Sequence, residues 1–269
     1  MIDVVATTSV AADWLRVVGA TNVRTRVIVK AGLDPASYLA TSADVAAVQR
    51  AELVVAVGRG LEPWLDAARQ GPAAGRPLVT LTDGLPERTT ASGAPDPYLW
   101  LDLANAKQMV TTLTAALVAA DPADETSFTA ARDAYIASLD ATDGEVRRVL
   151  EPVKGRGLVT AKETFGWFAA RYGLETVGSV VPSLDGRADI APQHLATLRQ
   201  AVQAKQVKAV FAETSVPDDS VRRLAQDAGV KPVVGADALR GDGLGPAGTA
   251  TDTFLGAMRH NARSIADNL

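Results

Sequence analysis

The chain has 269 residues, and this length predicts two lobes of about 120 to 150 residues each. Apolar residues make up 47% and charged residues 22%, as in ordinary globular proteins, and the net charge of -4 provides no basic surface, so nucleic acid is excluded as an expected partner. No stretch approaches the roughly 18 consecutive apolar residues of a membrane span, so any export signal or lipid anchor lies outside this sequence or does not exist.

The first part of the chain alternates apolar, β-branched runs with helical patterns, which is typical of a parallel sheet covered by helices on both faces. Val10, Trp14 and Val18 recur at helical spacing, with Ser9 as a candidate N-cap. The predicted strands are residues 4–6, 23–29, 53–57 and 78–81, the predicted helices are 9–18, 43–51 and 104–120, and the predicted loops are 31–42 and 83–97.

One long helix is predicted between the two halves, because residues 124–150 contain one glycine, no proline and an apolar stripe at helical spacing. At about 1.5 Å per residue, some 25 residues would extend nearly 40 Å, the height of two small lobes. We therefore predict an N-terminal lobe at residues 1–123, a linking helix at 124–150 and a C-terminal lobe at 151–269.

The second half repeats the alternation, so the predicted fold class is α/β, with two lobes that each hold a mainly parallel sheet flanked by helices, joined by one long helix. No internal sequence repeat is found, so any similarity of the lobes should be topological. The predicted strands are residues 158–160, 176–181, 208–211 and 232–234, and the predicted helices are 163–172, 192–204, 218–228 and 249–268.

Few residues offer catalytic or dinucleotide-binding chemistry. There is no cysteine, and the two histidines, His194 and His260, lie in helical patterns and are expected to be surface or structural residues. Residues 243–248 match G-x-G-x-x-G but lie far behind the preceding strand and include Pro246, so they are expected to shape a loop beside the cleft instead. We expect no enzyme and no cofactor.

Five segments together resemble the zinc/manganese-type solute-binding proteins of bacterial ABC importers, over nearly the whole chain and in order. The resemblance implies two α/β lobes tied by a long helix, with a metal held between them by three histidines and one carboxylate. It also implies an extracytoplasmic protein, periplasmic or anchored at the cell surface, that is a monomer and delivers a solute to a membrane permease. The segments are residues 4–10, 32–38, 60–65, 165–168 with 171–174, and 207–213.

The resemblance places the four family ligands at Ala36, Tyr98, Lys162 and Asp237. Ala36 has no donor atom, and the phenol of Tyr98, with an ordinary pKa near 10, is a poor ligand for zinc or manganese. Lys162 brings an ammonium that repels a divalent cation, which leaves Asp237 as the retained carboxylate. Because zinc needs about four well-placed donors, we do not expect zinc or manganese to bind in the family manner.

We predict that Lys162 and Asp237 form an ion pair between the lobes, with Tyr98 and Glu163 beside them, and that these four residues bind the ligand. The ligand itself is left open, and a small polar or zwitterionic solute would fit this set of charges. Two alternatives remain open. One is a metal-free interaction protein whose lobes are locked by the Lys–Asp pair, and the other is a hard cation held by oxygen atoms of Asp237 and Glu163.

Overall fold

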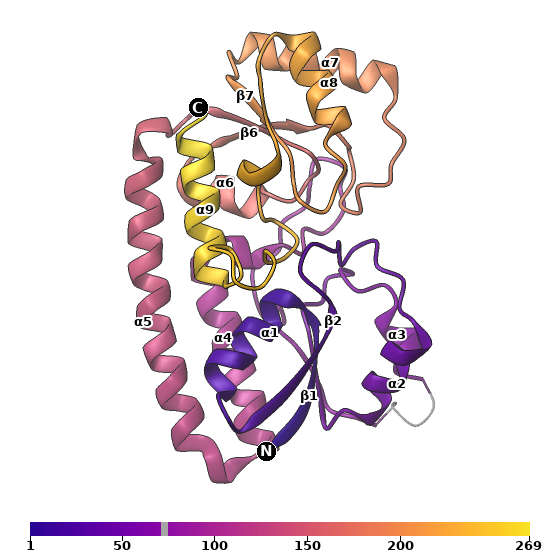
Figure 1. Cartoon of the computed structure of the whole chain (residues 1–269), viewed down its shortest axis with the longest axis vertical. Coiled ribbons are helices and arrows are strands. Elements are labelled where there is room, and N and C mark those ends of the chain that lie inside the picture. Colours follow the sequence, from indigo (N-terminus) through magenta and orange to yellow (C-terminus); the bar gives the residue numbers. More distant parts are fainter. Residues whose placement is uncertain (71–74) are drawn as a thin grey trace.

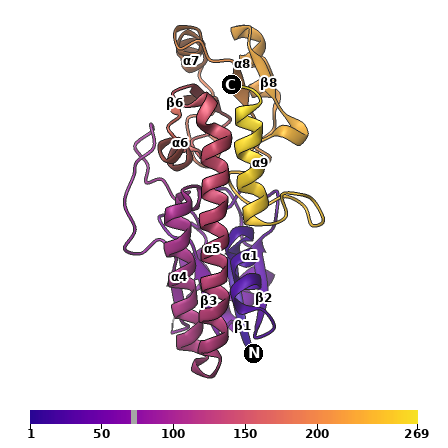
Figure 2. The same ribbon diagram turned by 90° about the vertical axis from the view of Figure 1, so that its left-hand side faces the viewer.

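The computed structural model describes residues 1–70 and 75–269, and it contains two α/β lobes stacked along the long axis with a single long helix beside both (Figure 1). The chain starts in one lobe and crosses to the other through the long helix. The loop before the last helix returns to the middle, and the last helix then runs beside the long helix to the C-terminus at the second lobe (Figure 2). The predicted fold class is confirmed.

The first lobe is built on a four-stranded parallel sheet with the order β2-β1-β3-β4. The central strands β1 and β3 are the most apolar runs of this half and are almost entirely buried, as expected of strands covered on both faces. The strands are β1 (Ile2–Thr8), β2 (Val23–Val29), β3 (Leu53–Ala56) and β4 (Leu78–Thr80), and the helices are α1 (Ser9–Gly19), α2 (Ser42–Arg50), α3 (Leu65–Ala68) and α4 (Leu103–Ala120).

The second lobe holds another four-stranded parallel sheet, with the order β6-β5-β7-β8. This order repeats that of the first sheet strand for strand, so the lobes are similar in topology, as predicted in the absence of a sequence repeat. The strands are β5 (Gly157–Thr160), β6 (Glu175–Ser179), β7 (Ala209–Phe211) and β8 (Lys231–Val233), and the helices are α6 (Gly166–Tyr172), α7 (Pro192–Ala204) and α8 (Asp219–Ala228).

Helix α5 (Glu125–Leu150) is the predicted link, and its 26 residues extend about 39 Å at the usual rise. It packs against α1 and α4 of the first lobe and against α9 (Phe254–Ala266), which lies beside it in both views (Figure 2). Its buried stripe includes Phe128 and Leu139, which belong to one apolar core shared by both lobes. In the part of the chain that the structure describes, no helix combines the length and apolar character needed to cross a membrane.

The starts of two helices differ from the prediction by three residues or more, and the N-cap of a third differs. Helix α6 begins at Gly166 rather than at residue 163. Thr8, not Ser9, caps α1, because the Thr8 side chain accepts a hydrogen bond from the amide of Ala11. The last helix begins at Phe254 rather than at residue 249, because Thr253 caps it and Gly248 adopts a positive φ of 80° in the turn before it. The freed hydroxyl of Ser9 accepts a hydrogen bond from the amide of Leu244 instead, which ties that turn to the first lobe.

Replacing Leu139 by alanine should destabilise the protein by about 2–5 kcal/mol, because it leaves a cavity in the core that α5 shares with its neighbours. Chemical denaturation of wild type and variant measures the difference. The control is Ser138→Ala, at an exposed position of the same helix, for which we expect a change within about 0.5 kcal/mol. Equal effects of the two substitutions would contradict the packing role of α5.

Candidate functional site

The candidate site lies between the lobes, where the carboxyl ends of strands from both sheets meet. Parallel strands bring the loops that follow them to one edge of a sheet, and ligand sites in such sheets form at that edge. Asp34 lies in the loop after β2, Lys162 directly after β5, Glu213 directly after β7, and Asp242 in the long loop between β8 and α9. The fold therefore brings together residues that are far apart in sequence.

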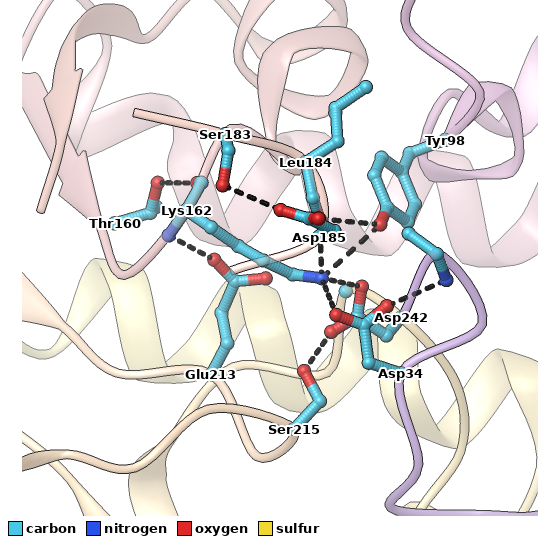
Figure 3. A network of polar contacts seen from close by, with 12 residues as sticks. Asp34, Tyr98, Thr160, Lys162, Ser183, Leu184, Asp185, Glu213, Ser215 and Asp242 are labelled. Atoms are coloured by element: carbon cyan, nitrogen blue, oxygen red, sulfur yellow. Dashed lines mark hydrogen bonds and ion pairs between the residues drawn. The ribbon is translucent and has the colours of Figure 1, made fainter. Parts of the chain in front are cut away.

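Lys162 is at the centre of the site, and its side chain is fully buried. Its Nζ lies 2.7 Å from Oδ2 of Asp34 and 2.7 Å from Oδ1 of Asp242. It also donates to the carbonyl oxygen of Leu184 at 2.8 Å and lies 3.3 Å from Oη of Tyr98 (Figure 3). Asp34 and Tyr98 belong to the first lobe and the other partners to the second, so one ammonium group bridges the two lobes.

A second layer of contacts fixes these groups. Oε1 of Glu213 accepts a hydrogen bond from the backbone amide of Lys162 at 3.1 Å, and the Thr160 hydroxyl donates to the Lys162 carbonyl at 2.7 Å (Figure 3). Oδ1 of Asp34 accepts from the amide of Ala36 at 2.9 Å, which leaves its other oxygen free to face Lys162. The hydroxyl of Ser215 donates to Asp242. Contacts within the protein thus orient the carboxylates without any external ligand.

Burial and the neighbouring charges together set the protonation states of the cluster. Burial lowers the pKa of Lys162, but the carboxylates of Asp242 and Asp34 outweigh burial, and the pKa ends above its ordinary value. Burial, together with the nearby Asp242, raises the pKa of Asp34 to about 6 and that of Glu213 to about 8. At neutral pH, Lys162 is therefore an ammonium ion and Glu213 mostly carries a proton.

Tyr98 stays a neutral phenol in this surrounding. Burial raises the pKa of Tyr98 well above its ordinary value, and the carboxylates of Asp242 and Asp34 raise it further. Its ring centroid lies 5.5 Å from Nζ of Lys162, within the range of a cation–π contact. The arrangement is an oxygen-lined enclosure for one positive charge, and Nζ of Lys162 fills it. Within residues 1–70 and 75–269, no group of three or more His, Asp or Glu side chains is arranged to hold a metal ion.

Of the four predicted ligand-binding residues, the structure brings together Tyr98 and Lys162. The predicted ion pair of Lys162 with Asp237 is wrong: a Lys–Asp bridge between the lobes exists, but its carboxylates are Asp34 and Asp242. Asp237 is exposed at the end of a short 3-10 helix, Gly235–Asp237, and its carbonyl accepts a hydrogen bond from Ser264. The loop continues for five more residues before it reaches the site.

Glu163 also lies outside the Lys162 cluster. Its carboxylate accepts hydrogen bonds from the backbone amide of Ser92, at 3.0 Å, and from the Ser92 hydroxyl. Glu163 and Asp237 line different hollows, so the pair of residues predicted to hold a hard cation is not brought together. Glu163 instead connects the two lobes at a second place.

Three residues of the cluster were missed in the sequence, and each had a signal. Asp34 stands two positions before Ala36, within the segment that carries the family resemblance. Glu213 ends the segment 207–213 directly after a buried strand. Asp242 stands immediately before the glycine-rich segment 243–248, which was predicted to lie beside the cleft. Next to it, the indole of Trp100 donates a hydrogen bond to the Gly241 carbonyl at 3.2 Å.

Both histidines have structural contacts, as predicted. Nε2 of His194 lies 2.8 Å from the carbonyl oxygen of Ser179, and Nε2 of His260 lies 2.9 Å from that of Ala238. Neither histidine contacts Lys162 or its partners.

Comparison with known proteins gives a consistent result. A family model described as zinc-uptake complex component A, periplasmic, matches residues 4–268. The zinc-binding protein TroA of Treponema pallidum is 28% identical over 270 residues, which cover 97% of this chain and 87% of TroA. The manganese-binding lipoprotein MntA of Bacillus subtilis is 27% identical over 276 residues, which cover 100% of this chain and 90% of MntA. The solved structure of TroA superposes with a TM-score of 0.90, covering 99% of this chain and 98% of that one at 26% identity.

Replacing Glu213 by glutamine should change how stability depends on pH. The folded-state pKa of about 8 lies above the ordinary 4.5, so folding favours the protonated carboxyl. Its contribution is complete below pH 4.5 and is lost as pH rises through about 8. Between about pH 5 and 9, the melting temperature of wild type should therefore fall by several degrees relative to Glu213→Gln.

Scanning calorimetry at a series of pH values measures this difference, with Glu87→Gln at an exposed position as the matched control. The control should run parallel to wild type. If the Glu213→Gln curve ran parallel to wild type as well, Glu213 would not bind its extra proton in the folded state.

Proposed function

The chain belongs to the family of periplasmic zinc-uptake complex component A proteins, and from this membership we propose that it is a solute-binding protein of an ABC importer in which Lys162 takes the place of the metal. Relatives carry names that describe zinc-binding or manganese-binding proteins. In this chain the position between the lobes holds an ammonium group.

One observation carries the proposal: the buried Nζ of Lys162 faces two carboxylates, one carbonyl and one phenol oxygen, contributed by both lobes. A divalent ion at this place would have to displace the ammonium or share the enclosure with it. Two like charges a few ångströms apart repel strongly in a buried site, where water does not screen them. Ala36 adds no donor that could compensate.

Family membership also gives the setting of the proposed function. The protein works outside the cytoplasmic membrane, in the periplasm or anchored at the cell surface, and its partner is the membrane permease of the importer. Its role is binding rather than catalysis. A cargo would have to be something other than a zinc or manganese ion bound in the family manner.

A second candidate function is supported by the contact between Lys162 and Asp34, which joins the lobes without any cargo. In that case the protein is an interaction module held closed by its own side chain. A solute screen by thermal shift separates the two functions, because a bound solute raises the melting temperature in proportion to RT ln(1 + [L]/Kd) and a locked module is not stabilised by any solute.

Calorimetric titration of chelator-treated wild type with zinc and with manganese should give no stoichiometric submicromolar binding.

Lys162→Ala removes the ammonium and leaves Asp34 and Asp242 facing each other. Breaking a buried ion pair in this way should destabilise the protein by about 3–5 kcal/mol. Manganese should then raise the melting temperature of Lys162→Ala and not that of wild type, because the freed oxygen atoms suit a hard cation.

The matched control is Lys208→Ala, which removes an exposed lysine and should behave as wild type in both measurements. Lys162→Met, which fills the same volume without the charge, provides a second variant if alanine prevents folding. Tight zinc or manganese binding by wild type, or an identical metal response of wild type and both Lys162 variants, would contradict the proposal.

A further inference from the structure

A groove lies between α5 and α9, on the side of the molecule that faces the viewer in Figure 2. Its volume is about 350 Å³, and its two walls are the helices themselves, along the stretch where they pack side by side. We call it the α5–α9 groove. None of the groups that contact Lys162 lines it, so it is separate from the site between the lobes.

Positive charge is in excess in this groove, although the chain as a whole has a net charge of -4. Arg148 comes from α5, and Arg259 and Arg263 come from α9, where they stand one helical turn apart. Glu145 is the one acidic side chain among the described residues that line the groove. Three guanidinium groups therefore share a single carboxylate.

That carboxylate pairs with Arg259. Oε2 of Glu145 lies 2.5 Å from Nε of Arg259, and Nη2 of the same arginine donates to the hydroxyl of Thr142 at 3.0 Å, so Arg259 is held across the two helices. The hydrogen bond from Arg259 lowers the pKa of Glu145, and the charges of Arg148 and Arg263 lower it further. All three arginines thus lie close enough to act on one carboxylate.

Arg148 and Arg263 are exposed, and neither has a carboxylate partner in the part of the chain that the structure describes. Nε of Arg148 donates only to the carbonyl of Gly144 in its own helix, at 3.2 Å, and Glu151, nearly one turn further along the chain, forms no ion pair with it. A guanidinium presents five donors in a planar fork that matches a carboxylate. The groove therefore offers two such forks, one from each helix.

The floor between these charges is apolar. Val146 and Ala262 are each 1% exposed and belong to the core through which α5 and α9 pack, and the half-buried Val149 extends that floor toward the surface. A lone inorganic anion would leave this apolar strip uncovered. A flat anionic membrane would not enter a concave groove, and the net negative charge of the chain would oppose its approach. The complementary partner is a peptide segment with both acidic and apolar side chains.

We propose that the α5–α9 groove binds an acidic segment of a partner protein, whose carboxylates pair with Arg148 and Arg263 while an apolar side chain between them covers Val149. This interaction surface goes beyond the proposed function. No residue of the Lys162 cluster takes part, so the binding does not depend on what occupies the position between the lobes.

The probe is a fluorophore-labelled peptide of about eight residues that alternates glutamate and leucine, with both ends blocked. Fluorescence anisotropy should show it binding at least about tenfold more tightly than the same peptide with glutamine in place of glutamate, because only a carboxylate forms a charged pair with guanidinium. Raising sodium chloride from about 50 to about 500 mM should weaken the binding at least about fivefold, since salt screens exposed charges.

Variants test the location. Arg148→Gln and Arg263→Gln should each weaken the glutamate peptide about threefold, and the double variant about tenfold. The matched control Arg223→Gln removes an exposed arginine of α8 outside the groove and should leave the affinity unchanged. Arg148→Glu combined with Arg263→Glu reverses the charge of the groove and should make it prefer the same peptide with lysine in place of glutamate. Because these side chains are exposed, the circular dichroism spectra should stay as in wild type.

Equal binding of the glutamate and glutamine peptides, or full binding of the glutamate peptide by the double glutamine variant, would overturn the proposal. Two further results would also contradict it. Inorganic phosphate binding as tightly as the peptide would make the groove a site for a small anion. Binding to vesicles with about 30% phosphatidylglycerol, without binding of the peptide, would make it a membrane contact.

Discussion

The ammonium group of Lys162 is the interaction on which the arrangement of the two lobes depends. A fully buried charge is stable only when well-oriented partners replace its lost hydration. Asp34 and Asp242 each lie 2.7 Å from Nζ, one from each lobe, and the Leu184 carbonyl completes the contact. Separating the lobes would leave Asp34 without its partner and would leave Lys162 with only Asp242 and the Leu184 carbonyl, so the charge itself favours the closed arrangement.

The two sheets set where the residues around Lys162 lie, whatever cation those residues surround. In both lobes the strand order is the same, and the loops after β2, β5, β7 and β8 deliver Asp34, Lys162, Glu213 and Asp242 to one place. This geometry would suit a cation bound by oxygen atoms, whether it is a free ion or the end of a side chain. The four loops therefore place a positive charge between the lobes, and in this chain that charge is the ammonium of Lys162.

The sequence predicted the fold well because its signals are local. The apolar runs of β1 and β3 and the stripe of α5 depend only on the spacing of neighbouring residues, and they form where they were expected. The site was predicted in part, because the family resemblance pointed to Lys162 and Tyr98. Asp237 was assigned from the family resemblance, and Asp242 was missed because the loop between β8 and α9 has no periodicity from which its path could be read. Asp34 was missed because only the three-dimensional path of its loop brings the carboxylate into the place that Ala36 leaves without a donor.

Lys162 and Glu163 are neighbours in sequence, yet they serve different contacts between the lobes. Lys162 reaches Asp34 in the first lobe, whereas Glu163 reaches Ser92 at the tip of the short hairpin formed by residues 89–95. A movement that separates the two lobes at this turn has to break both the Lys162–Asp34 and the Glu163–Ser92 contact. Their free energies therefore both favour the closed state, and a ligand that contacts both lobes at either place would favour the same state. These two contacts, built on one turn after β5, are thus linked to each other through the closure of the lobes.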